Sequence, residues 1–352
     1  MGFLLTIKSE TVKEGKGGEN LMAKKILIAA TALLALSMLI SQGFACVGPI
    51  FPCYCPRHIP PIVSTRWLSA NLNRRNLVVL DVRSPDAYSE GHILGAINVP
   101  EGEWYVNDPF TVDVSIPWME MPDKEELFNL IGGAGITKNS LVVVVGSTSG
   151  PLSPAPLALY AVAGTTRVAI TLLYAGVKNV AILDGGYEKW VADGYPTETG
   201  TVTPTPVIYR GKVDKSMVVS MAYVEKKIGK SIIVDARDPE VYNCGVQEPW
   251  TTEKGHIPTA KNLPTPSLWK ITYENSTYAR YITYKDVFTL KRMTEEVVGK
   301  AKGKEIIVYC GVGGYASTAY FVLSEVLGYS NVRLYDGSAQ EWTHAGKPVE
   351  CP

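Results

Sequence analysis

The residues best suited to chemistry lie in one short segment, where Cys310 stands between an apolar run and a glycine-rich turn. Ile306–Tyr309 predicts a buried strand, and residues 316–327 have the pattern of an amphipathic helix. The glycines let backbone N–H groups at the positive end of that helix face the sulfur. We therefore predict a nucleophile with a lowered thiol pKa, in preference to a buried structural cysteine. The predicted anion cradle consists of Gly311, Val312, Gly313, Gly314 and Tyr315.

The length and charge of the chain exclude some classes of protein. At 352 residues the chain is too long for one ordinary core and suits two domains. Lysine plus arginine and aspartate plus glutamate both number 34, so no positive excess marks a nucleic-acid binder. We expect no nucleic-acid partner.

The amino-terminal region has the pattern of an export signal. Lys24 and Lys25 precede the apolar residues 26–40, which suit a signal core and are too few to span a membrane. Measured from Met1 the charged region is too long for a signal, whereas measured from Met22 it has normal proportions. We expect translation to start at Met22, and we expect the mature, exported protein to lack residues 1–45.

Cleavage behind Ala45 would leave Cys46 as the first residue, which is the arrangement that lipid attachment requires. Gly43 stands where bacterial lipoprotein signals carry leucine, so release into the periplasm and membrane association through a lipid on Cys46 both stay open. Residues 46–64 form a tether rich in cysteine and proline. In place of a metal site, we expect either a local disulfide among Cys46, Cys53 and Cys55, or a lipid on Cys46 with Cys53 and Cys55 paired.

The sequence repeats itself, because Asp184 and Trp190 recur 152 residues later as Asp336 and Trp342. Three further motifs also occur twice in the same order: D-x-R at 81–83 and 235–237, G-H-I at 91–93 and 255–257, and N-x-P at 98–100 and 262–264. The chain therefore contains two copies of one domain.

Each copy alternates short apolar strands with helical stretches, which predicts an α/β fold with a mainly parallel sheet flanked by helices. The expected strands are residues 77–82, 141–145, 180–183, 232–235, 306–309 and 332–335. Residues 197–205 lack apolar periodicity and predict a linker between domains at 65–200 and 206–352.

With these paired motifs, the chain resembles the tandem-domain rhodanese family of sulfurtransferases. The resemblance extends from about Trp67 to the carboxyl terminus and implies an inactive first domain and a catalytic second one. It implies that Cys310 takes sulfane sulfur from a small donor, holds it as a persulfide and passes it to a thiol or cyanide. It implies neither a cofactor nor a metal.

Several residues depart from the mercaptopyruvate enzymes of that family, which the C-G-x-G start of the loop resembles. Val312 replaces their loop serine, and Val241 and Trp250 fall where they have two arginines that bind the substrate carboxylate. Tyr315 stands where many members have an arginine or threonine. Since apolar side chains cannot make the bidentate bonds of arginine, we expect a neutral or weakly charged donor such as a persulfide or polysulfide.

Other residues of the repeated motifs have two interpretations. Arg237 either contacts the substrate pocket or ties its strand to the following loop. His92 matches a histidine that reaches the catalytic loop in mercaptopyruvate enzymes, but His256 fills the same place in the second copy, which favours a shared folding role. Asp336 and Trp342 are expected to hold the last helix and loop.

Two stretches interrupt the repeat. Residues 147–164 are expected to form a surface loop on their own domain, before a helix that begins near Thr166; a lid over the interdomain cleft is the alternative. An insertion of ten residues between Asp235 and His256 carries Cys244, which we expect to be unpaired, although a resolving role toward Cys310 stays open. Cys351 could pair with almost any other cysteine.

Two rival functions remain beside sulfur transfer. A phosphatase or arsenate-reductase-like activity would need an arginine that closes a longer loop, and residues 315–317 include none. The alternative from another class is a non-catalytic carrier of sulfur or a related element for a membrane-associated system.

Overall fold

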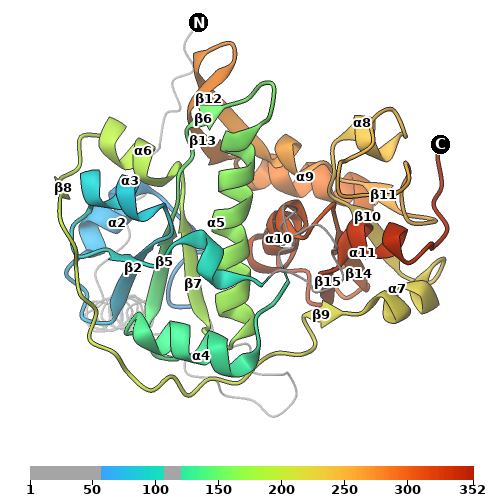
Figure 1. Cartoon of the computed structure of the whole chain (residues 1–352). Helices are drawn as coiled ribbons and strands as arrows, with labels where there is room; N and C mark the ends of the chain where they lie inside the picture. The colour runs from blue at the N-terminus through green and yellow to red at the C-terminus, as the bar shows by residue number, and fades with distance from the viewer. Residues whose placement is uncertain (1–56, 107–119) are drawn as a thin grey trace, which may run out of the picture. The chain divides into compact units, whose positions relative to one another are not determined.

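The computed structural model describes residues 57–106 and 120–352 (Figure 1). The expected start at Met22, the signal segment, the lipid site at Cys46, and Cys53 and Cys55 lie outside the described residues. Within the described part, the chain forms two successive α/β halves, as the internal repeat predicts.

The first half is built on a five-stranded parallel sheet in the order β1-β7-β5-β2-β4. All of the central strand β5 is buried, because its alternate residues belong to two separate cores: Val142 and Val144 to one, Leu141 and Val143 to the other. The strands are β1 (Ile62–Val63), β2 (Leu77–Asp81), β4 (Ile97–Asn98), β5 (Leu141–Val145) and β7 (Asn179–Leu183).

The helices of this half begin at residues whose chemistry favours a helix start. Ser64 and Ser84 accept hydrogen bonds from the first turns of α2 and α3, and Pro85 opens α3. The helices are α2 (Thr65–Asn71), α3 (Pro85–Glu90), the 3-10 helix η1 (Glu101–Trp104), α4 (Lys124–Gly133), α5 (Leu157–Tyr174) and α6 (Gly186–Ala192).

The second half repeats this plan with a parallel sheet in the order β11-β10-β14-β15-β9. Its strands are β9 (Val218–Val219), β10 (Ile232–Asp235), β11 (Lys261–Asn262), β14 (Ile306–Tyr309) and β15 (Val332–Tyr335). Its helices are α7 (Met221–Lys227), α8 (Pro239–Tyr242), the 3-10 helix η2 (Thr265–Leu268), α9 (Val287–Val298), α10 (Gly314–Phe321), the π-helical η3 (Val322–Val326) and α11 (Ser338–His344).

All six predicted strands are confirmed to within one residue at their ends, but the helix after Cys310 differs from its prediction. Helix α10 starts at Gly314, and all eight of its residues are buried, so it is not amphipathic. The reason is its position, because α10 packs against α5 of the first half as well as against its own sheet (Figure 1). The core is therefore continuous between the halves.

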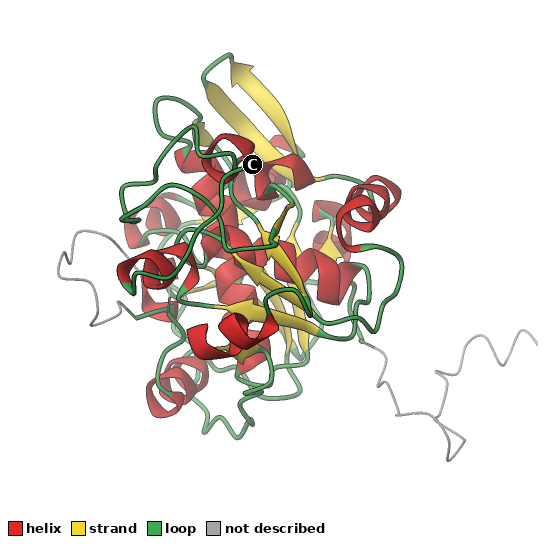
Figure 2. Ribbon diagram, turned by 90° about the vertical axis from the view of Figure 1, so that its right-hand side faces the viewer, coloured by secondary structure: helices red, strands yellow, loops and turns green. Residues whose placement is uncertain are grey.

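The prediction for residues 147–164 is wrong. Strand β6 (Gly150–Pro151) pairs with β13 (Tyr278–Tyr284), which forms an antiparallel hairpin with β12 (Trp269–Asn275) in the second half. Helix α5 begins at Leu157 and not near Thr166, because most of the apolar residues from Ala158 onward are already buried in the fold. The hairpin of long strands stands out at the top of Figure 2.

The link between the halves is longer than predicted. It begins as β8 (Thr197–Glu198), which pairs with β3 (His92–Ile93), and it then follows the first half as far as β9. Along the way the N–H of Val207 donates to the carbonyl of Gly132 over 2.9 Å. Figure 1 shows this segment below the first sheet.

One described helix, α5, is long and apolar enough to cross a membrane. Most of it is buried inside the fold, which is the environment of a core helix in a globular protein. Its sequence therefore reflects its place between the two sheets.

Candidate active site

Cys310 lies directly after β14, in the turn that leads into α10. Its side chain is buried, and the N–H of Gly313 donates to its sulfur over 3.1 Å. Gly313 has a φ of 96°, a left-handed conformation that suits glycine. The N–H of Cys310 donates to Oγ of Ser338 over 3.2 Å. The predicted glycine-shaped turn around the sulfur is confirmed.

The predicted charge state of Cys310 is wrong. Burial raises the pKa of its thiol above the ordinary value, and the carboxylate of Glu248 raises it further. N–H groups of Ala316, Val312 and Gly313 lower the pKa, but they do not offset the loss of solvation. Cys310 is therefore mainly a thiol at neutral pH and must lose a proton before it attacks.

Gly311 is the point where the loop contacts the insertion of the second half. A Cβ atom at this position would lie 2.3 Å from Nε1 of Trp250 and 2.8 Å from Oε2 of Glu248. Both distances are shorter than any normal contact of a Cβ atom. The loop therefore requires glycine here, because Trp250 and Glu248 cover it.

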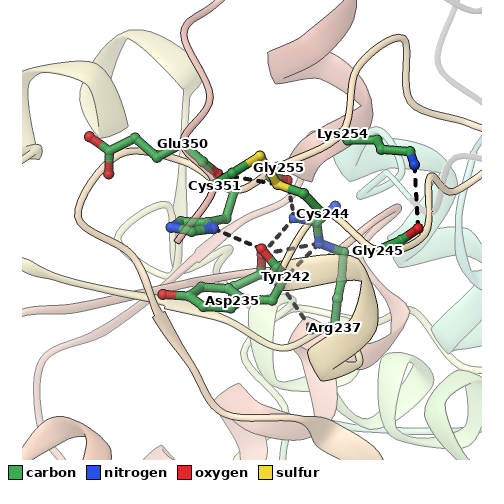
Figure 3. The surroundings of a disulfide bond; sticks show 10 residues. Asp235, Arg237, Tyr242, Cys244, Gly245, Lys254, Gly255, Glu350 and Cys351 are labelled. Atoms are coloured by element: carbon green, nitrogen blue, oxygen red, sulfur yellow. Dashed lines mark hydrogen bonds and ion pairs between the residues drawn. A yellow bond between two sulfur atoms is a disulfide. The ribbon is translucent and has the colours of Figure 1, made fainter.

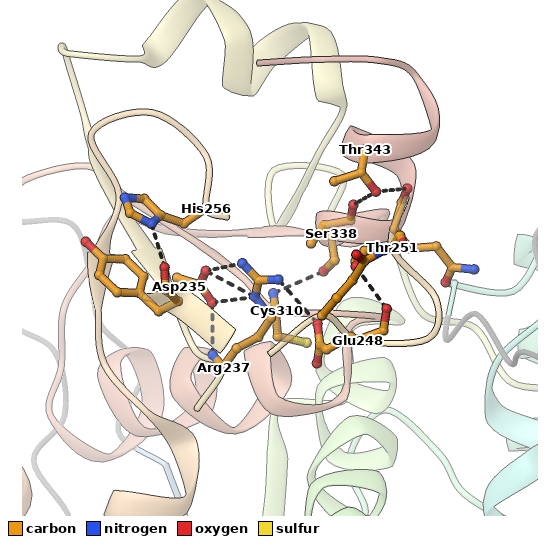
Figure 4. Close-up of polar contacts among 12 residues, drawn as sticks. Asp235, Arg237, Glu248, Thr251, His256, Cys310, Ser338 and Thr343 are labelled. Atoms are coloured by element: carbon orange, nitrogen blue, oxygen red, sulfur yellow. Dashed lines mark hydrogen bonds and ion pairs between the residues drawn. The ribbon is translucent and has the colours of Figure 1, made fainter. Parts of the chain in front are cut away.

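Glu248 is a site residue that the sequence reasoning missed. Figure 4 shows its carboxyl beside the side chains of Cys310 and Arg237. Burial raises the pKa of Glu248 to about 7, although Arg237 Nη1 lies 3.3 Å from its Oε2 and acts to lower it. The available signal was an acidic residue two positions before Trp250.

Arg237 has the structural role that was one of its two predicted interpretations. Its guanidinium donates to Oδ1 and Oδ2 of Asp235 at 3.0 and 2.6 Å and to the carbonyl of Gly255 at 2.7 Å. Arg83 makes the same contacts with Asp81 and Gly91 in the first half. Arg237 does not line the cavity and reaches it only through Glu248.

The sulfur of Cys310 faces a cavity of about 330 Å³ between the two halves. Of the predicted loop, Cys310, Gly311, Val312, Gly314 and Tyr315 line this cavity, and Gly313 is not among the lining residues. Trp250 of the insertion also lines the cavity.

The first half supplies the opposite wall, which the sequence reasoning missed. Glu101 and Tyr105 follow β4, and Tyr160 belongs to α5. The rings of Tyr160 and Tyr315 lie 5.8 Å apart across the boundary between the halves. Tyr160, Ala161 and Ala163 thus line the cleft, which agrees with the alternative interpretation of this segment as its cover.

Glu101 is the second carboxyl of the cavity. Burial raises its pKa to about 7. A Cβ atom on Gly164 would lie 2.0 Å from Oε1 of Glu101, so this carboxyl packs directly on the backbone of α5. Only a residue without a side chain leaves room for it.

His92 and Val241 do not line the cavity. His92 is buried, its ring stacks on Tyr88, and its Nδ1 lies 3.0 Å from the carbonyl of Tyr88. His256 repeats this arrangement with Tyr242, at 2.9 Å. The shared folding role is confirmed. Val241 is buried in α8.

The prediction that Cys244 is unpaired is wrong, since it forms a disulfide with Cys351 (Figure 3). The two cysteines meet because His256 and Glu350 form an antiparallel β-bridge. In it the N–H of His256 donates to the carbonyl of Glu350 over 3.0 Å. This bridge brings the carboxyl-terminal tail to the insertion. Cys310 is the free cysteine of the described residues, so Cys244 is not its resolving partner.

Asp336 does more than hold its own helix. Its carboxylate pairs with Arg167 of α5 and accepts a hydrogen bond from the N–H of Met121 over 2.8 Å, so it joins the two halves. Asp184, its counterpart, accepts from the N–H of Tyr284 in the second half over 2.9 Å. Trp342 has the predicted packing role, because its Nε1 donates to the carbonyl of Pro348.

Among the described residues, no three histidine, cysteine, aspartate or glutamate side chains gather as metal ligands would. The chemistry available at the site therefore rests on one buried sulfur, two carboxyls of raised pKa and several aromatic rings.

Comparison with known proteins finds one protein family in both halves of the chain. The model of the rhodanese-like domain matches residues 64–193 and 220–345. A protein of Synechococcus elongatus named as a thiosulfate sulfurtransferase is 33% identical over 289 residues, which cover 82% of this chain and 84% of that one. The sulfur carrier protein TtuD of Thermus thermophilus is 29% identical over 83% of this chain and 97% of its own.

Solved structures share the fold. The anaerobic ergothioneine biosynthesis enzyme of Chlorobium limicola, in complex with its natural substrate trimethyl histidine, superposes with a TM-score of 0.67 at 22% identity. The match covers 83% of this chain and 70% of that chain.

Proposed function

The chain belongs to the rhodanese-like family and is a sulfurtransferase, and we propose that it moves sulfane sulfur through a persulfide on Cys310. The observation that carries the proposal is the position of the sulfur, in a glycine-shaped turn that opens on a cavity between the halves. The matching turn of the first half, at residues 144–150, has no cysteine. One copy of the domain therefore holds the sulfur and the other closes the site.

The transfer has two steps in which atoms and electrons balance. The deprotonated sulfur of Cys310 attacks the outer sulfur of a donor persulfide R–S–SH, and the donor leaves as R–SH with the proton that Cys310 gave up. An acceptor thiol then attacks the outer sulfur of the Cys310 persulfide. The acceptor leaves as a persulfide, and the pair of electrons on Cys310 takes up a proton.

For the donor we propose a neutral or weakly charged persulfide or polysulfide. Support comes from the lining of the cavity, because no described lining residue is a lysine, arginine or histidine. A small dianion such as thiosulfate would lose water without gaining a charged partner there. The thiosulfate sulfurtransferase name of the relatives makes thiosulfate the donor to compare.

The runner-up is a carrier that holds sulfur on Cys310 and gives it to one protein partner. It is supported by the likeness to the sulfur carrier protein TtuD. A carrier would show slow turnover with small acceptors and fast transfer to that partner.

The test is the intact mass of the protein after incubation with glutathione persulfide, polysulfide, thiosulfate or mercaptopyruvate. We expect a sulfur-sized increment from glutathione persulfide that cyanide removes and that Cys310→Ser lacks, and a smaller increment from inorganic polysulfide, thiosulfate and mercaptopyruvate, which are small anions at neutral pH. The double variant Cys244→Ser/Cys351→Ser is the matched control and must keep the increment. No increment from any donor would contradict the proposal.

We also propose that the protein works outside the cytoplasm, in the periplasm or anchored to a membrane through Cys46. The signal-like residues 22–45 support this, and so does the Cys244–Cys351 disulfide, because such bonds persist in oxidising compartments. The check is the mass of the protein from fractionated cells. A precursor that keeps residue 1 and stays in the cytosol would contradict it.

A further inference from the structure

The described walls of the cavity carry two carboxyl groups and no basic side chain. Glu101 comes from the first half and Glu248 from the second, and no described lining residue is basic. Glu248 covers Gly311 of the loop that holds the sulfur, and Glu101 packs on Gly164 of the facing helix and lines the same cavity.

The arginines of this region are already paired. Arg237 is bound by both carboxylate oxygens of Asp235, and Arg167 is bound by Asp336. Arg167 and Asp336 form a neutral pair, whereas Arg237 also reaches Glu248, with its Nη1 3.3 Å from Oε2 of that residue. One guanidinium therefore serves both Asp235 and Glu248, so ionised Glu248 leaves this group of three with one net negative charge, and ionised Glu101 adds another to the cavity.

Four aromatic residues also line the cavity: Tyr105, Tyr160, Trp250 and Tyr315. The face of an aromatic ring attracts a cation placed within about 6 Å. Tyr315 is only 9% exposed, and its hydroxyl has no hydrogen-bond partner among the described residues. A buried hydroxyl without a partner favours a ligand that supplies one.

From this geometry we infer that the preferred sulfur acceptor is a thiol that also carries a positively charged group, bound between Glu101, Glu248 and the aromatic rings. The inference rests on the proposed function of Cys310 and adds the class of acceptor. A protonated amine gains ion pairs with the carboxylates and contact with the ring faces. An anionic acceptor would be repelled by the same groups.

The transfer step itself is unchanged. The sulfur of the aminothiol attacks the outer sulfur of the Cys310 persulfide, the bond between the two sulfurs breaks, and Cys310 takes the proton that the acceptor lost. The ammonium group keeps its charge throughout. No oxidant or reductant is needed.

The preference should depend on pH. Because burial raises the pKa of both carboxyls to about 7, each ionises as the pH rises through neutrality, and the cation binds better above that pH. The charged and titratable groups that act on Glu248 are Arg237 and Asp235, and it acts in turn on Cys310, Tyr160 and Tyr315. The titratable group that Glu101 acts on is Tyr105, and Arg167 acts on the same tyrosine.

The test compares three small thiols of similar size: cysteamine, 2-mercaptoethanol and 3-mercaptopropionate. Each is mixed with wild-type protein that has been converted to the Cys310 persulfide, and the rate of sulfur loss is measured in a single turnover. The three thiols differ in nucleophilicity. Each rate is therefore divided by the rate at which the same thiol takes sulfur from glutathione persulfide in solution, without protein. We expect cysteamine to exceed 3-mercaptopropionate by about tenfold or more at pH 8, and by less at pH 6.

The variants Glu101→Gln and Glu248→Gln remove one charge each while keeping size. Each should reduce the ratio of cysteamine to 3-mercaptopropionate several-fold, and the two together should nearly abolish it. Glu103→Gln and Glu253→Gln are matched controls, because both residues are exposed and near in sequence, and they should leave the ratio unchanged.

The outcomes separate the two claims. If wild-type protein forms no persulfide, the proposed function fails. If it forms one and passes sulfur to all three thiols equally, or fastest to the anion, the function stands and the cationic acceptor is wrong. A preference that the double glutamine variant keeps in full would also contradict the inference.

Discussion

At the scale of single residues, two opposing effects act on the pKa of the Cys310 thiol: burial raises it, and hydrogen bonds from the turn lower it. The turn aims N–H groups at the sulfur, yet loss of solvation and Glu248 together raise the thiol pKa. The sequence predicted the turn but not the burial, because the groups that exclude water come from the insertion and from the other half.

The first prediction concerns the pH dependence of Cys310. Because the pKa of the thiol is raised, its alkylation by iodoacetamide should become fast only as the pH rises well above neutrality. Glu248→Gln removes a charge that raises this pKa, so its rate profile should move to lower pH. Glu253→Gln serves as control. A profile that stays in place or moves to higher pH in Glu248→Gln would contradict the assigned interaction.

The second prediction concerns Gly311→Ala. The new methyl group would collide with Trp250 and Glu248, which forces the loop or the insertion to shift at a cost of about 1–3 kcal/mol. We expect at least a tenfold loss of kcat/KM for sulfur transfer, measured with glutathione persulfide as donor. Gly303→Ala, where a Cβ meets no atom within 4 Å, should keep full activity. Equal activity of the two variants would show that the cover over Gly311 is not needed.

At the scale of elements, the repeated motifs predicted what depends on neighbours in sequence. Strands β10, β14 and β15 have the predicted bounds, and the D-x-R arginines bond to their own aspartates. The start of α5 and the burial of α10 were missed, because contacts between the halves decide them. Glu101 and Tyr160 could not be assigned to the site for the same reason: no local pattern records a partner in the other half.

The third prediction concerns the disulfide that fastens the insertion. Reduction of Cys244–Cys351, which are 107 residues apart, should lower the free energy of unfolding by about 2–4 kcal/mol. The measurement is thermal unfolding with and without dithiothreitol. The variant Cys244→Ser/Cys351→Ser should unfold at the lower temperature in both conditions. Identical transitions for reduced and oxidised wild type would contradict a structural role.

At the scale of the whole molecule, the two halves share one site and one core. A cluster of buried residues extends through both, β6 of the first half pairs with β13 of the second, and Asp184 and Asp336 each bond to the opposite half. The first half, whose matching turn has no cysteine, therefore contributes the wall of the cavity opposite Cys310. It also stabilises the second half through the shared core.

The fourth prediction tests this connection. Arg167→Met leaves the buried Asp336 without its charged partner and should cost about 3–5 kcal/mol in unfolding free energy. Arg167→Met/Asp336→Asn should recover much of that loss, because the amide oxygen can still accept from Met121. The control is Arg292→Met in an exposed pair with Glu296, which should change stability by less than about 1 kcal/mol. A loss no larger than the control's would contradict a role for the pair in joining the halves.

The most direct test of the central claim is a single transfer from isolated protein. Wild-type protein is loaded with glutathione persulfide, freed of donor, and mixed with an equimolar thiol acceptor while both masses are followed. We predict that the protein loses one sulfur from the peptide that contains Cys310, that the acceptor gains it, and that Cys310→Ser neither loads nor transfers. Sulfur on another residue, or transfer by Cys310→Ser at the wild-type rate, would contradict the assignment of Cys310.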